Sequence, residues 1–471
     1  MFFLLHSLHF ICLIGQALAA PADLVHDASL EKRALVPNVL SGAIGTVDGA
    51  LSSVVGGVAA DSSEASGIFS AILGAIEDTI KDQVTATPTN IAQATSVVAS
   101  IFSATPTTIY DDIIKLAANG IAPDATDLAN LLVGAVSGPN SETNINLKNP
   151  ASPIYPKKSS TDPAYTLTET QLRQVIYIPS TFTYGQKPPV ILVPGTGATG
   201  YQSFDGNFIP LLTGVSYADP VWLNIPIQLL GDAQVNAEYV AYAINYISGI
   251  SKRNSSIISW SQGGIDTQWA LKYFSSTRKV VSNFIAISPD YHGTQLAYLL
   301  CPSFPTLPCA PAVIQQEYNS NFIATLRSNG GDSAYVPTTT VYSSTDEIVQ
   351  PQSGTGASAY LLDARNVGVT NNQVQAVCGG HPAGLFYTHE GVLYNPLAFA
   401  LAKDALTNGG PGRTSRLSSL NTVCDEVVAP GLNLANVLTT EEAISTAGIS
   451  VLIYPFKVFV EPPIMSYAAG K

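Results

Sequence analysis

Charge is scarce in this sequence, and positive charge most of all. Asp, Glu, Lys and Arg make up 12% of the 471 residues, with 21 Lys and Arg against 34 Asp and Glu, so the formal net charge is −13. Because Lys and Arg drive the binding of nucleic acids, this balance argues against a nucleic-acid-binding protein. It also disfavours tight electrostatic binding to an anionic membrane surface.

Long apolar runs are missing as well. The apolar stretch at the N-terminus is short and broken by polar residues, and the uncharged run over residues 83–110 contains Pro88, Pro106 and many hydroxyl side chains. A membrane-spanning helix needs about 20 consecutive apolar residues, so we expect no integral membrane segment.

Cysteine is rare, and the common cofactor motifs are absent. Cys12 lies in the N-terminal apolar stretch, which leaves Cys301, Cys309, Cys378 and Cys424. These four lack the C-x-x-C spacing of zinc sites, and the sequence has neither a Walker loop nor a dinucleotide-binding fingerprint. We therefore expect disulfides, in one of three pairings, and no metal ion or organic cofactor.

The first positive feature is a targeting signature. Residues 1–19 resemble a signal peptide, and residues 20–33 resemble a short pro-segment that ends at Lys32-Arg33. Asn254-Ser255-Ser256 is the only N-glycosylation sequon. These features predict a secreted, extracellular glycoprotein with disulfides.

The rest of the chain divides into three parts. Apolar residues at helical spacing within 69–80, 91–102, 109–118 and 128–136 predict an N-terminal helical domain over residues 34–138. Residues 139–163, rich in Pro, Asn and Ser, are expected to form a linker. In residues 164–471 apolar runs alternate with helix-like runs, and we predict strands at 175–178, 190–193, 257–258, 284–287 and 338–343. This alternation predicts an α/β domain, with a mostly parallel sheet covered by helices on both faces.

The sequence Ser259-Trp260-Ser261-Gln262-Gly263 lies between a predicted strand and a predicted helix. A serine at a sharp strand-to-helix turn is typical of a nucleophile elbow, although Ser259 replaces the usual first glycine. Ser261 is the candidate nucleophile. The alternative interpretation is a serine in an ordinary turn.

A serine nucleophile needs a histidine base and an acid that orients the histidine. In α/β-hydrolases these groups follow the serine in the order acid, then histidine. His292 comes too early, and His389 is preferred to His381 because it follows an irregular stretch and precedes an apparent helix. The acid is Asp346 or Glu347, directly after the strand at 338–343, and Asp346 is closer to the strand.

The oxyanion hole needs two donors near the nucleophile. One is the backbone N–H of Gln262. The other is Thr196, in the turn Pro194-Gly195-Thr196-Gly197 after the strand at 190–193, where both its N–H and its hydroxyl are available.

Several ordered segments of the chain resemble the Candida antarctica lipase B-like family of fungal lipases, in the α/β-hydrolase superfamily. They are Val193-Pro194-Gly195-Thr196-Gly197, Trp260-Ser261-Gln262-Gly263-Gly264, Pro289-Asp290-Tyr291, the run from Tyr342 to Gln352, Ala376-Val377-Cys378, and Glu461-Pro462-Pro463-Ile464-Met465. The resemblance covers the chain from about Pro153 to its end, and the N-terminal helical region lies outside it.

The resemblance implies a triad of Ser261, Asp346 and His389 and an oxyanion hole of Thr196 and Gln262. It also implies four residues around the substrate. Asp290 and Gln316 would be polar groups of the pocket floor, and Trp260 and Ile348 would line the acyl or alcohol side. The alternative for these four is a structural role in packing.

The chain also departs from the family. It lacks a cysteine near Tyr217–Trp222 and the C-terminal extension with a further disulfide, and its region before Glu461 differs. For the four cysteines we expect Cys378 to pair with Cys424 and Cys301 with Cys309.

The sequence therefore predicts a secreted serine lipase or esterase that acts on acylglycerol or other ester substrates, transiently at a lipid interface. Water or another alcohol would release the acyl group. The alternatives are a carboxylesterase or polyester hydrolase, and a secreted binding protein that keeps the fold without activity. The helices of residues 34–138 would either cap the active site or form a separate stalk.

Overall fold

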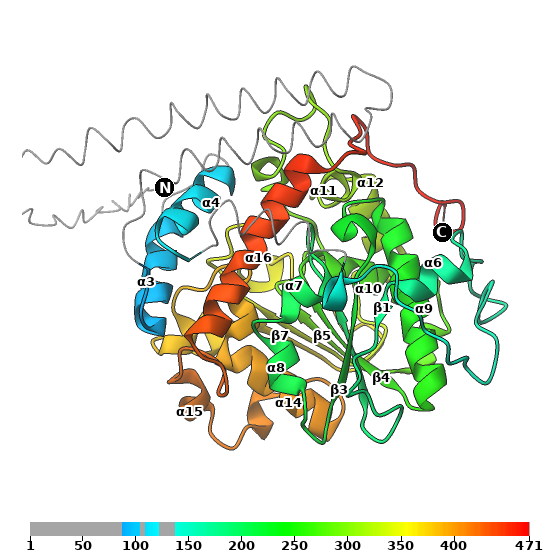
Figure 1. Ribbon diagram of the computed structural model, residues 1–471, viewed down its shortest axis with the longest axis horizontal. Helices are drawn as coiled ribbons and strands as arrows, with labels where there is room; N and C mark the ends of the chain where they lie inside the picture. The colour runs from blue at the N-terminus through cyan, green and yellow to red at the C-terminus, as the bar shows by residue number, and fades with distance from the viewer. Residues whose placement is uncertain (1–86, 104–108, 122–136, 471) are drawn as a thin grey trace, which may run out of the picture.

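The computed structural model describes residues 87–103, 109–121 and 137–470 (Figure 1). The predicted signal peptide and pro-segment, and the expected helices at 69–80 and 128–136, lie outside the described residues.

A mostly parallel β-sheet forms the centre of the described molecule. Its seven strands lie in the order β1-β3-β2-β4-β5-β6-β7, and β1 alone runs antiparallel to its neighbour. The strands are β1 (Ile176–Tyr177), β2 (Pro189–Val193), β3 (Asp219–Leu223), β4 (Ser255–Trp260), β5 (Val281–Ile287), β6 (Thr338–Tyr342) and β7 (Val369–Gln373). This confirms the predicted α/β class.

Strand β2, in the middle of the sheet, is apolar on both faces because helices cover both. In β2, Val190 and Leu192 pack into the core on one face, and Ile191 and Val193 pack into the core on the other. Successive side chains of a strand point to opposite faces, so a strand buried twice needs a continuous apolar run.

Helices α9 and α10 pack on one face of the sheet, while α7, α8, α14 and α16 pack on the other (Figure 1). The helices of the described residues are α3 (Ile91–Phe102), α4 (Ile109–Ala118), α6 (Glu169–Gln174), α7 (Gly200–Phe204), α8 (Phe208–Leu212), α9 (Ala233–Ser251), α10 (Gln262–Tyr273), α11 (Pro311–Gln315), α12 (Asn321–Arg327), α13 (Val374–Val377), α14 (Pro396–Asn408), α15 (Leu420–Cys424) and α16 (Leu434–Ile453). None of the helices in these ranges combines the length and the apolar character needed to cross a bilayer.

Polar caps fix where the long helices begin. The Asn433 side chain accepts the N–H of Asn436 at the start of α16, and the Asn436 side chain accepts the Asn433 N–H in return. The Asp232 side chain caps α9 by accepting the Gln234 N–H. Such caps satisfy N–H groups that have no partner inside the helix.

Helices α3 and α4 have the bounds that the sequence predicts, and they pack on the outer side of α16 (Figure 1). Ile109 and Ile113 of α4 are buried in the same apolar core as the sheet residues Leu192 and Ile258. At the contact, a Cβ atom added to Gly448 of α16 would lie 2.5 Å from Cδ1 of Ile113. The described N-terminal helices therefore share a core with the sheet.

The segment 139–163, predicted as a linker, is bound along the α/β domain. The Pro139 carbonyl accepts hydrogen bonds from Trp222 and Asn224, and the Lys148 carbonyl accepts one from Tyr246. The Asn146 side chain donates to one carbonyl of α6 and to one of β1. These bonds hold the segment against the domain, although its Pro, Asn and Ser content is typical of a loose connection.

Two strands, β3 and β7, were not predicted from the sequence, and the predicted strand at 175–178 is shorter in the structure. Strand β7 is an edge strand of sequence Val-Thr-Asn-Asn-Gln and is half-buried, so it lacks an apolar run. Strand β3 contains Pro220, which is unfavourable in a central strand. Both strands are defined by pairing with distant neighbours rather than by local pattern.

Candidate active site

Ser261 lies at the turn between β4 and α10, at the carboxyl end of the sheet. Its backbone has φ 53° and ψ −129°, and its N–H donates to the carbonyl of Ile287 on the neighbouring strand. A positive φ is unfavourable for a residue with a side chain, and the surrounding pairing holds it in place. This geometry is that of a nucleophile elbow.

Gly263 allows the elbow to be this sharp. A Cβ atom at this position would lie 2.5 Å from the Pro194 carbonyl oxygen and 2.6 Å from that of Val193. Neither backbone atom can move aside, so the start of α10 can approach the end of β2 only without a side chain. This approach places the turn at 194–197 next to the N-terminus of α10.

Asp346 lies in the turn after β6, where the sequence predicts the acid. Its Oδ1 accepts the N–H groups of Ile348 at 3.0 Å and Val349 at 2.7 Å. Its Oδ2 lies 2.8 Å from Nδ1 of His389. These bonds fix the carboxylate with one oxygen directed at the imidazole.

His389 is 2% exposed, and its ring is held from several sides. Nδ1 contacts Asp346, and the ring lies 5.3 Å from that of Trp260, centroid to centroid. Its Nε2 atom is buried and has no hydrogen-bond partner within the described ranges. Ser261, which is 4% exposed, and His389 line the same cavity.

Carboxyl groups dominate the electrostatics around this histidine. Burial lowers the pKa of His389, but the charge and hydrogen bond of Asp346, together with the nearby carboxyl groups of Glu347 and Asp290, outweigh burial, so the pKa lies above its usual value. Burial raises the pKa of Asp290 to about 7 and that of Glu347 to about 8. Burial also raises the pKa of Glu390 well above its usual range. Near neutral pH, Asp346 is therefore the strongest partner for a protonated imidazole.

A glutamine pair holds Thr196 beside the cavity. The Thr196 hydroxyl lies 2.9 Å from Oε1 of Gln262 and 3.1 Å from Oε1 of Gln316, and both can accept its proton. Nε2 of Gln316 donates to Oε1 of Gln262, and Nε2 of Gln262 donates to Asp266. This network places the hydroxyl near the N-terminus of α10, where the helix dipole favours negative charge.

The cavity walls are mostly apolar and come from distant parts of the chain. The residues that line it are Thr196, Trp260, Ser261, Thr294, Leu296, Ala297, Leu300, Val313, Gln316, Ile348, Val349, His389, Ile444 and Ala447. Ile444 and Ala447 belong to α16, so this helix covers the site. No described residue of α3 or α4 lines the cavity; these helices contact the other side of α16.

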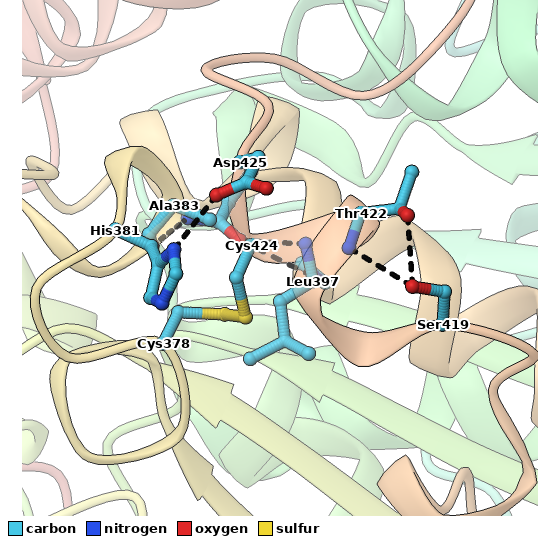
Figure 2. The surroundings of a disulfide bond; sticks show 10 residues. Cys378, His381, Ala383, Leu397, Ser419, Thr422, Cys424 and Asp425 are labelled. Atoms are coloured by element: carbon cyan, nitrogen blue, oxygen red, sulfur yellow. Dashed lines mark hydrogen bonds and ion pairs between the residues drawn. A yellow bond between two sulfur atoms is a disulfide. The ribbon is translucent and has the colours of Figure 1, made fainter.

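Most of the residues named from the sequence meet at this cavity. Trp260, Gln316 and Ile348 line it, whereas Asp290 is fully buried, is not among the lining residues, and has no hydrogen-bond partner for either carboxyl oxygen within the described ranges. His381 lies elsewhere, with Nδ1 2.7 Å from Asp425 and a side chain that is 43% exposed (Figure 2). It does not line the cavity.

The cysteines pair as expected, Cys301 with Cys309 and Cys378 with Cys424. Figure 2 shows the second bond between the segment before His381 and the end of α15. Asn254 of the sequon is exposed at the turn before β4. Within the described ranges, no group of three or more His, Cys, Asp or Glu side chains is placed to hold a metal ion.

The sequence did not indicate the residues that cover the site. Leu300, Val313, Ile444 and Ala447 are ordinary apolar residues whose pattern fits any buried helix or loop. Their only signal is hydrophobicity, which does not distinguish a cavity wall from a filled core. The buried Glu390 and Glu441 carry a stronger signal, because a buried carboxyl group needs a partner.

No protein-family model matches the chain. Lipase B of Pseudozyma antarctica is 36% identical over 315 residues, which are 66% of this chain and 87% of that protein. The crystal structure of Aspergillus fumigatus lipase B aligns with a TM-score of 0.78 and 47% sequence identity, and the alignment covers 90% of this chain and 99% of that chain. Residues 164–471 are about two thirds of the sequence, so an alignment that covers 90% of the chain extends into the N-terminal region. The motifs that resemble the lipase family do not reach this region.

Proposed function

The chain belongs to the lipase B family, and we propose that it is a secreted serine lipase or esterase that hydrolyses acylglycerol and related carboxylic esters. One observation carries the proposal: His389, bonded to Asp346 at 2.8 Å, lines the same cavity as Ser261 at its strained turn. A binding protein without activity would have no use for a buried imidazole held by a carboxylate beside a buried serine at a strained turn.

In the proposed mechanism Oγ of Ser261 attacks the ester carbonyl carbon while Nε2 of His389 takes the hydroxyl proton. Nε2 is free for this step in the described structure. Asp346 accepts the Nδ1–H, which sets the tautomer and stabilises the imidazolium. Collapse of the tetrahedral intermediate gives the acyl-enzyme and releases the alcohol, which receives the proton from His389.

The oxyanion would be held by the backbone N–H groups of Gln262 and Thr196 and by the Thr196 hydroxyl. That hydroxyl donates to a glutamine oxygen in the structure, so it must rotate toward the oxyanion as charge develops. Water, or a second alcohol in transesterification, then attacks the acyl-enzyme with His389 as base. No step needs a metal ion or an organic cofactor.

The covered cavity favours one alternative, a carboxylesterase that acts on small soluble esters. Ser261 is 4% exposed and α16 forms part of the cavity wall, so a slender acyl chain fits more easily than a bulky triacylglycerol. Rates on emulsified long-chain triacylglycerol and on a short soluble ester separate the two. Secretion and glycosylation at Asn254 are supported by the targeting signature, the exposed sequon and the two disulfides.

The chain offers a matched control for the triad. His381 also has Nδ1 within 2.7 Å of an aspartate, but on the surface, away from the cavity. We expect Ser261→Ala and His389→Ala to lower kcat on a p-nitrophenyl ester at least about 10³-fold, and His381→Ala to keep activity within about twofold. A phosphonate ester should label the wild type at Ser261. Equal losses in the two histidine variants, or labelling at another serine, would refute the assignment.

A further inference from the structure

Buried side chains form hydrogen bonds with both the backbone N–H and the backbone carbonyl of His389. Its N–H donates to Oε2 of Glu347 at 2.9 Å. Its carbonyl accepts from Nε1 of Trp260 at 3.2 Å and from the hydroxyl of Ser288 at 3.0 Å. The ring can pivot only about its side-chain bonds, so the position of Nε2 depends on these three contacts as well as on Asp346.

Three consecutive residues after β6 bind the segment that carries the histidine. The Thr345 hydroxyl donates to the Tyr387 carbonyl at 2.9 Å, Asp346 bonds to the His389 ring, and Glu347 accepts the His389 N–H. The acid turn and the histidine segment are therefore joined side by side. Glu347 supplies the bond to the main chain, whereas Asp346 supplies the bond to the ring.

Glu347 is buried among other titratable groups. Asp346 and His389 interact with it electrostatically, and so does Glu390, which also interacts with Glu441 of α16. Burial, reinforced by the Asp346 carboxylate, raises the pKa of Glu347 to about 8, so the group is mostly neutral at pH 7. A neutral acid can accept the N–H bond without placing a second negative charge beside the imidazole.

We propose that Glu347 is a positioning residue, which accepts the His389 backbone N–H and thereby fixes Nε2 toward Ser261. This inference rests on the proposed roles of Ser261, Asp346 and His389. It assigns the two acids different tasks: Asp346 orients and stabilises the ring, and Glu347 holds the main chain that bears it. Small displacements of a catalytic group lower the chemical rate while substrate binding is kept, so the loss should fall on kcat.

Two substitutions of similar size separate the effect of the hydrogen bond to the His389 N–H from the effect of side-chain packing. Glu347→Gln keeps an oxygen acceptor and cannot ionise, whereas Glu347→Met keeps the length and loses the acceptor. We expect E347M to lower kcat on a soluble p-nitrophenyl ester about 10- to 100-fold with KM unchanged, and E347Q to stay within about threefold. Glu426 is exposed, so E426M serves as the control and should match the wild type.

The pH profile gives a readout that loss of packing would not produce. If Glu347 acts as a neutral acceptor, the acid limb of kcat/KM, which reports His389, should coincide in E347Q and the wild type. If the apparent pKa of the acid limb is lower in E347Q by one unit or more, the charge of Glu347 and not its hydrogen bond supports the histidine. That result would overturn the proposal. Wild-type kcat in E347M, or equal loss in E347Q and E347M, would overturn it as well.

Ser288→Ala provides an independent variant if E347M does not fold. It removes one donor to the His389 carbonyl, and we expect kcat to fall several-fold with KM unchanged; no change in kcat would count against backbone positioning. Phosphonate labelling distinguishes a failure of the proposed function from a failure of the positioning role of Glu347. If the wild type is not labelled at Ser261, the proposed function fails; if it is labelled and E347M is labelled at the same rate, positioning alone fails.

Discussion

The two disulfides close loops of very different length, which allows a quantitative comparison. Cys378 and Cys424 are 46 residues apart, whereas Cys301 and Cys309 are 8 apart. In the chain-entropy treatment, the first bond stabilises the fold by about 4 kcal/mol and the second by about 2.5 kcal/mol, because a longer loop loses more freedom when it is closed. Removal of the first bond should therefore be the more damaging change.

The surroundings of the longer loop strengthen this expectation. Both Cys378 and Cys424 are buried in the apolar core beneath α14, next to Leu397 (Figure 2). The bond also ties the segment leading to His389 to α15. By contrast, the 301–309 loop is partly exposed, although Leu300 beside it lines the cavity.

The test compares C378A/C424A with C301A/C309A by thermal melting under non-reducing conditions. At roughly 2 °C per kcal/mol for a large domain, Tm should fall by about 8 °C in the first double variant and about 5 °C in the second. Peptide mapping without reductant checks the pairing. A larger fall of Tm in C301A/C309A, or a Cys301–Cys378 peptide, would refute the reasoning.

Three further expectations follow from buried or exposed single residues. Burial raises the pKa of Asp290 to about 7, so the protonated Asp290 stabilises the fold fully below about pH 4, and this contribution is lost as pH rises through 7. Asp290→Asn should therefore reduce by about 4 kcal/mol the decrease in the free energy of unfolding between pH 4 and pH 8. Urea unfolding over this pH range measures the difference. Gly448→Leu should push α4 away from α16 and lower the free energy of unfolding by about 1–3 kcal/mol. The rate on triacylglycerol relative to the rate on a small ester should then rise. An unchanged ratio would mean that α4 does not hold α16 over the site. Asn254→Gln should abolish any mass added by glycan to the secreted protein, and an unaltered mass would exclude this site.

Local pattern was enough to find the buried strands that contain an apolar run. β2 has such a run, and so do the central parts of β4 and β5, and helices α3 and α4 have the periodicity and stop signals of their observed bounds. β7 was missed because its side chains are polar and half-buried, and only its register with β6 makes it a strand. Edge strands lack the strong pattern that double burial imposes.

The sequence by itself determined the types and order of the candidate reactive residues. With few histidines after the N-terminal stretch, and with the acid expected just past a strand, it indicated Ser261, Asp346 and His389, because the chemistry of an activated serine restricts which residue types can serve. It could not choose between Asp346 and Glu347 except by proximity to the strand.

Tertiary structure alone decided what each of these acids contacts and what covers them. Asp346 reaches the ring and Glu347 the backbone of His389, although the two are adjacent in sequence, because the turn after β6 directs their side chains to different atoms. The cover, α16, lies about 180 residues after Ser261 and meets it through long-range packing. Hydrophobicity makes such a helix bury a face, but the opposing surface that it meets is set only when the whole chain has folded.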